Sequence, residues 1–146
     1  MNCWIFVANN WTDEGISARE VIIARAGDRF WGIPENARHA HSLQRGDLIV
    51  WYAAGRNNQM LMGTATLAGP LRQVGPDERD PFAHGTQRFR AEQGADLQDV
   101  DLWETEKPFH RLVPRLRFIT NPARWGQYLQ GSIIRVSAED YATMVD

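Results

Sequence analysis

The sequence lacks the features that mark several whole classes of protein. Its 146 residues include one cysteine, Cys3, so no disulfide can form within the chain. It has no stretch of eighteen apolar residues, which excludes a membrane-spanning helix. The first residues carry neither a basic segment nor a small-residue cleavage site, so we expect no signal peptide. These absences predict a cytoplasmic protein in a reducing compartment, with Cys3 as a buried, inert thiol.

Motifs for phosphate binding, nucleophilic catalysis and metal binding are also missing. The chain contains no glycine-rich phosphate loop and no G-x-S-x-G turn. Its four histidines have no accompanying pattern of cysteines or carboxylates, and they are His39, His41, His84 and His110. We therefore predict no metal site and no cofactor. A Ser-His-Asp arrangement depends only on spatial proximity, so the sequence leaves it open.

The pattern of apolar residues predicts short strands that alternate with short helices. Strands are expected at residues 4–7, 48–52, 60–67, 97–103 and 132–136. Ser17 opens a capping box before a helix that we expect to end at Gly27. Further helices are expected at 87–93, at 123–129 after the capping residue Asn121, and after Ser137. Gly63, inside a strand, indicates a bulge or a close backbone approach.

This order of elements favours an α+β fold in one domain that spans residues 1–146. The chain contains no internal repeat, low-complexity tract or linker. The non-local strand order predicts a small, mixed, strongly curved sheet or barrel.

Charge is distributed unevenly along the chain. Residues 77–106 contain nine acidic residues and three arginines, whereas residues 107–138 contain six basic residues and no acid. Two interpretations stay open: the later arginines pair with the acidic segment, or they face phosphates. The candidate phosphate contacts are Arg111, Arg115, Arg117 and Arg124.

Six tryptophans in 146 residues are far more than usual. Trp4 and Trp103 lie on predicted strands and are expected to fill the core. Trp31 lies beside Gly32 and close to Pro34, so we expect it outside any regular element, lining a concave pocket rather than the main core. Flat aromatic faces next to glycine and asparagine suit the stacking of a planar base.

The chain resembles the EVE domain in five segments that occur in the family's order. They are WIFVANN at residues 4–10, FWGI at 30–33, RGDLIVWY at 45–52, MGTA at 62–65 and GSIIRVS at 131–137. The EVE domain belongs to the PUA-like superfamily, together with YTH and ASCH domains. The resemblance implies a PUA-like curved mixed β-sheet or pseudo-barrel flanked by short helices.

The resemblance also implies that a modified base of DNA or RNA, flipped out of its strand, is held in an aromatic cage. Trp31 corresponds to the first cage tryptophan, and Gly32 would offer backbone groups to the base edge. Asn9 and Asn10 match the polar pair that follows the first strand, and Arg135 matches the basic residue of the closing strand. Ala8 replaces the usual lysine of the family.

The second wall of the cage is left open among several aromatic residues, which are Trp11, Trp51, Tyr52, Phe82 and Phe89. The family's Arg-Asn pair after Trp-x-Gly is matched only loosely, by Arg38.

The function expected from these features is a monomeric module that binds a modified base and catalyses no reaction. One alternative is an ASCH-type amidohydrolase acting on nucleosides, which needs a lysine and a glutamate in the pocket; Lys107 is the only lysine. Another is a protein-interaction module, whose exposed aromatic residues would form a flat patch. Asp13 and Glu14 are the acidic residues nearest to the polar pair, and we expect them only to precede the first helix.

Overall fold

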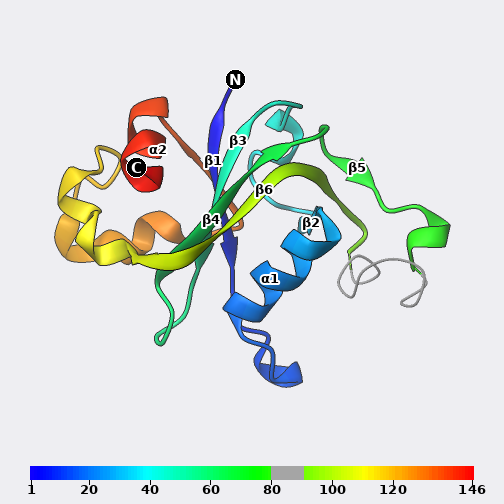
Figure 1. Ribbon diagram of the computed structural model, residues 1–146, viewed down its shortest axis with the longest axis horizontal. Helices are drawn as coiled ribbons and strands as arrows, with labels where there is room; N and C mark the ends of the chain where they lie inside the picture. Colours follow the sequence, from blue (N-terminus) through cyan, green and yellow to red (C-terminus); the bar gives the residue numbers. More distant parts are fainter. Residues whose placement is uncertain (80–90) are drawn as a thin grey trace.

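Seven strands form one strongly curled sheet, a half-barrel, in this computed structural model, which describes residues 1–79 and 91–146 (Figure 1). The strands are β1 (Cys3–Ala8), β2 (Phe30–Gly32), β3 (Leu48–Ala53), β4 (Met60–Leu67), β5 (Arg72–Gln73), β6 (Gln93–Pro108) and β7 (Ile133–Val136). Their order is β2-β6-β4-β3-β1-β7, and β5 pairs with β6. β1 is parallel to β3 and antiparallel to β7, so the sheet is mixed, as expected.

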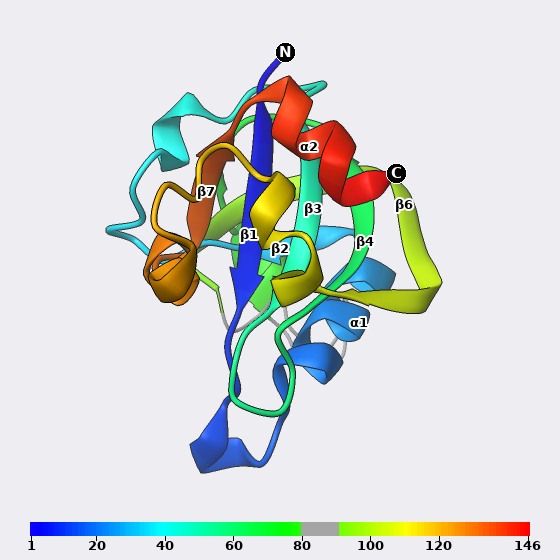
Figure 2. The same cartoon turned by 90° about the vertical axis from the view of Figure 1, so that its left-hand side faces the viewer.

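Helices cover both faces of this sheet. The α-helices are α1 (Ala18–Asp28) and α2 (Ala138–Val145). The 3-10 helices are η1 (Thr12–Glu14), η2 (Ala40–Ser42), η3 (Pro76–Arg79), η5 (Phe109–Arg111), η6 (Val113–Arg115) and η7 (Pro122–Leu129). Figure 2 shows α2 lying across the face formed by β1 and β3, which are among the strands that it contacts. No helix within the described residues is long and apolar enough to cross a membrane.

Alternation along the strands produces two cores, one on each face of the sheet. In β1, Trp4 and Phe6 pack on the face that α1 covers, whereas Ile5 and Val7 pack on the face covered by α2 and η5–η7. Trp4 is fully buried, and its indole N–H donates to Asp47 Oδ2 at 2.9 Å.

The capping box predicted at Ser17 is present. Ser17 Oγ accepts from the backbone N–H of Glu20, and Glu20 Oε2 accepts from the backbone N–H of Ser17. The expected end of the helix at Gly27 is wrong, because α1 continues to Asp28. The left-handed residue that terminates it is Arg29, at φ 56°, whose N–H donates to the carbonyl of Ala26.

Two other predicted helices differ from the structure. Residues 122–129 form two turns of 3-10 helix separated by non-helical angles at Arg124, and the Asn121 side chain makes no capping hydrogen bond. Of the helix expected at 87–93, residues 87–90 lie outside the described residues. Ala91 and Glu92 are not helical, and Gln93 already begins β6.

The prediction for Gly63 is confirmed. The register between β3 and β4 shifts beside it, and so does the register between β4 and β6. A Cβ atom at Gly63 would lie 2.2 Å from the carbonyl oxygen of Asp101, so β6 can approach β4 this closely only at a glycine.

Candidate ligand-binding site

A cavity of about 120 Å³ lies where the end of β1, strand β2, helix α1 and the residue before β7 meet. We call it the β1–β2 cavity. Its lining comes from distant parts of the chain and consists of Val7, Ala8, Asn9, Trp11, Val21, Arg25, Trp31, Gly32, Pro34 and Ser132. The structure therefore brings together four of the predicted site residues, namely Asn9, Trp11, Trp31 and Gly32.

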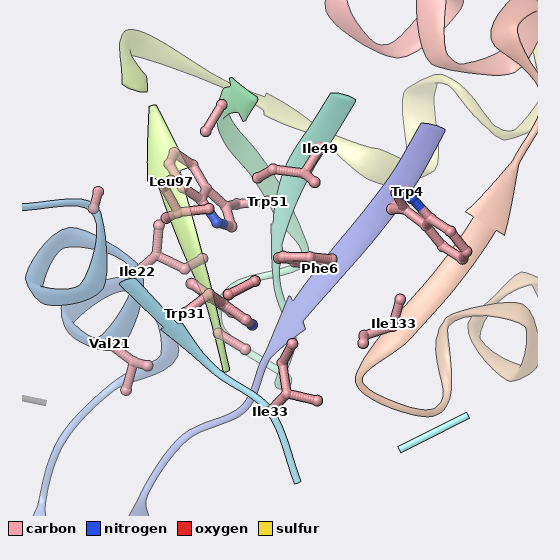
Figure 3. Packing of buried hydrophobic residues seen from close by; sticks show 14 of the residues in the cluster. Trp4, Phe6, Val21, Ile22, Trp31, Ile33, Ile49, Trp51, Leu97 and Ile133 are labelled. Carbon is pink, nitrogen blue, oxygen red and sulfur yellow. The ribbon is translucent and has the colours of Figure 1, made fainter. Parts of the chain in front are cut away.

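Trp31 contributes to this cavity and also to the main core. Its placement outside regular structure and outside the core is wrong: Trp31 is the middle residue of β2, pairs with Ala95 of β6, and is 1% exposed. Figure 3 shows its side chain directed into the core alongside Phe6 and Trp51. The ring centroids of Phe6 and Trp51 lie 5.8 and 6.1 Å from that of Trp31. A strand of only three residues, followed closely by proline, has the sequence pattern of a loop.

Trp11 reaches the cavity from outside the sheet. Its backbone forms an isolated bridge with Ile16, in which the Trp11 N–H donates to the Ile16 carbonyl at 2.7 Å and the Ile16 N–H donates back at 3.1 Å. This small hairpin holds the half-buried indole against the cavity. Among the candidates for the second wall, Trp11 is the described residue that lines the cavity with Trp31.

Arg25 lies between these two indoles. Its Cζ atom is 4.7 Å from the ring centroid of Trp31 and 5.6 Å from that of Trp11, both within cation–π range. Its Nη1 donates to the carbonyl oxygen of Gly32 at 3.2 Å. Burial lowers the pKa of the Arg25 guanidinium to about 10, so the group stays charged near neutral pH.

Arg25 is not among the site residues that the sequence predicts, although the sequence contains a signal for it. Arg25 follows Val21 by four residues and Ile22 by three, so it lies on the face of α1 that these residues bury. An arginine on an apolar helical face is unusual and identifies a buried polar position.

Gly32 presents its backbone polar groups to the same region. The Ile33 N–H donates to the carbonyl of Gln93, and the Leu97 N–H donates to the carbonyl of Arg29. The odd-numbered residues of segment 29–33 therefore bond to β6. Gly32 lies between odd-numbered residues of this segment, so its N–H and C=O point away from β6, to the side of β2 on which the described residues pair no further strand. This side of β2 therefore presents one backbone donor, the Gly32 N–H, and one acceptor, the Gly32 carbonyl, which already accepts from Arg25.

Four other predicted site residues do not line the cavity, namely Asn10, Trp51, Tyr52 and Arg135. Asn10 holds the first residue of α1, because its Oδ1 accepts from the Ala18 N–H at 2.8 Å. The same Oδ1 accepts from Asn58 Nδ2 at 3.1 Å. Trp51 is fully buried behind Trp31, and its indole N–H has no partner in the structure as described. Tyr52 packs on the opposite face of the sheet against Phe109. Alternation along β3 sends Trp51 and Tyr52 to different faces, so they cannot line one cage.

Arg135 lies on an adjoining cavity of about 650 Å³. This second cavity shares Pro34 and Ser132 with the β1–β2 cavity, and Arg38 also lines it. Arg135 is exposed, and its Nη2 donates to Asn2 Oδ1 at 3.2 Å. Two exposed arginines thus lie beside the β1–β2 cavity on the side of Pro34.

The other basic candidates are exposed on η5–η7 and the loop that precedes η7. Arg117 pairs with Glu139 of α2 at 3.0 Å, which is not a member of the acidic segment 77–106. Arg111, Arg115 and Arg124 are exposed and line neither of these two cavities.

Lys107, Cys3 and the described histidines could act as bases, nucleophiles or metal ligands, and they lie outside the lining of the β1–β2 cavity. Within residues 1–79 and 91–146, no cluster of histidine, cysteine and carboxylate side chains could hold a metal ion. Lys107 donates from Nζ to the backbone carbonyls of Met144 and Asp146, and its Nζ lies 4.8 Å from the ring centroid of Trp103, which is half-buried. Cys3 is buried, and burial raises the pKa of its thiol.

Comparison with known proteins identifies relatives of this fold, although no family model matches the chain. A UPF0310 protein from Pyrococcus abyssi is 22% identical over 152 residues, which cover 97% of this chain and 95% of that protein. The human THYN1 protein, solved in complex with DNA containing 5-methylcytosine, superimposes with a TM-score of 0.61 at 10% identity, over 97% of this chain and 94% of THYN1.

Two further solved structures have the same architecture. A hypothetical protein from Leishmania major gives a TM-score of 0.61 at 18% identity, over 97% of this chain and 90% of its own. Rpa0253 from Rhodopseudomonas palustris gives 0.59 at 15% identity, over 99% and 90%. At these identities the likeness establishes the fold.

Proposed function

We propose that this chain, whose fold is that of an EVE-like domain of the PUA-like type, binds a single base of a nucleic acid in the β1–β2 cavity. The base is flipped out of its strand and stacks between Trp11 and Trp31. The observation that carries this proposal is the position of Arg25. A planar, delocalised guanidinium lies within cation–π range of both indoles, so a flat π-system fits the same space.

The energetics favour such a site. Extruding a base costs a few kcal/mol, and each stacking contact with an aromatic side chain returns about 1–3 kcal/mol. Two tryptophan walls therefore offset the cost of extrusion. The edge of the base would be recognised by the Gly32 N–H and C=O and by the amide of Asn9, because an incorrect base leaves these groups unpaired.

A methyl group on the base adds affinity in this cavity. Apolar side chains, including Val7, Ala8, Val21 and Pro34, form part of its lining. Burial of one methyl group contributes about 0.8 kcal/mol, which is roughly a fourfold gain in affinity. Because the THYN1 structure of the same fold was solved with DNA containing 5-methylcytosine, that modification is the first to test.

Exposed arginines would bind the flanking phosphates. Arg38 and Arg135 line the adjoining cavity, and we place the strand along this side. Arg111, Arg115, Arg117 and Arg124 are additional phosphate contacts for longer ligands. Binding should weaken as salt rises, with a slope that reflects a few phosphate contacts.

The test is a binding screen with short single- and double-stranded oligonucleotides, each carrying one modified base. Trp11→Ala should weaken the best ligand roughly 5- to 150-fold, because one stacking wall is lost. Trp103→Ala is the matched control, since Trp103 is also half-buried but lies in β6 and lines neither of the two cavities described above. Equal losses in the two variants, or no binding of any oligonucleotide, would refute the proposal.

We further propose that binding occurs without turnover. The residues proposed at the base, namely Asn9, Trp11, Trp31 and Gly32, include no general base that works near neutral pH. The nearby acids Asp13 and Glu14 are exposed in η1. Mass spectrometry of modified nucleosides incubated with the protein should show no product. Turnover that disappears in Asp13→Asn or Glu14→Gln would contradict this.

A further inference from the structure

The Arg25 guanidinium occupies the space in which the proposed function places the base. It lies within cation–π range of both walls, and its Nη2 is 3.2 Å from the position of a Cβ built on Gly32. The same Cβ would lie 2.9 Å from the Cβ of Ala91, so glycine leaves room for both Ala91 and the guanidinium. Arginine and a nucleobase share the features that matter here, a flat delocalised group with N–H donors on its edge.

The structure holds this guanidinium weakly. Of its five N–H donors, Nη1 makes a single long hydrogen bond to Gly32. Nε is buried and has no partner, and no carboxylate pairs with Arg25 among the described residues. A largely buried charged group without an ion-pair partner is costly, so moving the guanidinium into solvent recovers part of that cost.

The size of the cavity points in the same direction. The space left beside Arg25 is about 120 Å³. A cavity of about 150 Å³ holds one benzene molecule, and a nucleobase carries exocyclic groups in addition to its ring. A base therefore fits only after the guanidinium has moved out from between the indoles.

We propose that Arg25 is a built-in competitor for the base, and that ligand binding is an exchange in which the base replaces the guanidinium between Trp11 and Trp31. This inference rests on the proposed function. It makes Arg25 a specificity-determining residue, because the ligand must restore the hydrogen bond that the Gly32 carbonyl loses. Bases with an amino N–H can do so, including those with one methyl on the amino group. Adenine or cytosine with a dimethylated amino group cannot.

The first experiment compares oligonucleotide affinities of the wild type and Arg25→Ala. Removing the competitor should tighten binding about 2- to 30-fold, the equivalent of one cation–π interaction. Alanine favours helix, so α1 should be retained. Arg45→Ala controls for the loss of one positive charge, because Arg45 is exposed and lines none of the cavities described above. Unchanged or weaker binding by Arg25→Ala would overturn the exchange.

The second experiment tests the guanidinium position without nucleic acid. Guanidinium chloride at low millimolar concentration, compared with sodium chloride at equal ionic strength, should raise the melting temperature of Arg25→Ala but not of the wild type. It should also weaken oligonucleotide binding by Arg25→Ala alone. The same response in both proteins would overturn the proposal.

Together the two experiments separate the two claims. Selective stabilisation of Arg25→Ala by guanidinium, with no oligonucleotide bound by any variant, would refute the base as ligand. Base binding by all variants with no gain in Arg25→Ala would refute the exchange and leave the base-binding function standing.

Discussion

Trp31 should be much more important for stability than a residue that only lines a binding pocket. Its side chain is 1% exposed and packs against Phe6 and Trp51, with Arg25 over its ring. Replacing a buried tryptophan by alanine costs about 3–5 kcal/mol. Domains of this kind are stabilised by about 5–15 kcal/mol in total, so Trp31→Ala should remain folded only marginally. Its midpoint of thermal unfolding should fall by about 10–20 °C.

Trp11 provides the comparison, because it lies on the same cavity but outside the sheet. Trp11→Ala should cost only about 1 kcal/mol of unfolding free energy, since its indole is half-buried and packs at the edge of the core. Urea unfolding followed by circular dichroism measures both variants. Equal midpoints for Trp31→Ala and the wild type would refute the placement of Trp31 in the core. A loss for Trp11→Ala as large as that for Trp31→Ala would refute the distinction between the two walls.

Three further predictions concern the rest of the fold. Asp47→Asn should cost about 2–4 kcal/mol in urea unfolding, because the buried carboxylate accepts from the backbone N–H groups of Asn2 and Gln44 and from the indole N–H of Trp4, and an amide must turn its own NH₂ group toward one of these donors; an unchanged unfolding midpoint would contradict this. Burial raises the pKa of Tyr52 to about 12, above the ordinary value of about 10, so its contribution to stability is complete below pH 10 and is lost as pH rises to 12. The unfolding free energy of Tyr52→Phe, measured with urea, should therefore fall by about 2–3 kcal/mol less between pH 10 and pH 12 than that of the wild type. Identical pH profiles of the two proteins would contradict the burial effect. Gly63→Ala should lower the unfolding free energy by about 1–3 kcal/mol, because its Cβ would displace the Asp101 carbonyl; an unchanged melting temperature would argue against this close contact.

Much of the fold follows from the sequence, because its strands have clear local patterns. The strand at Trp4 is a continuous apolar run, and the returning strand matches the expected bounds 60–67. The capping boxes or capping residues at Ser17 and Ser137 correctly mark the starts of both α-helices. Such signals depend on neighbouring residues alone, so they can be read without knowledge of tertiary structure.

The site was predicted only in part, because its geometry depends on contacts between distant segments. Trp31 looks like a loop residue until β6 supplies the partner strand for β2. Trp51 is expected at the site because it is aromatic, but its strand directs it behind Trp31. Tyr52 follows it and so lies on the other face. To predict the role of Arg25 one needs the distance between α1 and β2, and the helical pattern of the sequence does not give that distance.

The origin of the residues that line the β1–β2 cavity also determines at which stage of folding a ligand can bind. Asn9 and Trp31 come from the first quarter of the sequence and Ser132 from near residue 146, and β1 must pair with both β3 and β7. Contacts between segments so far apart in sequence form slowly during folding, because long loops must close first. The pocket is thus complete only when the last strand has joined the sheet. A chain in which β7 has not yet joined β1 lacks the Ser132 side of the pocket, so ligand binding reports that this long-range pairing has formed.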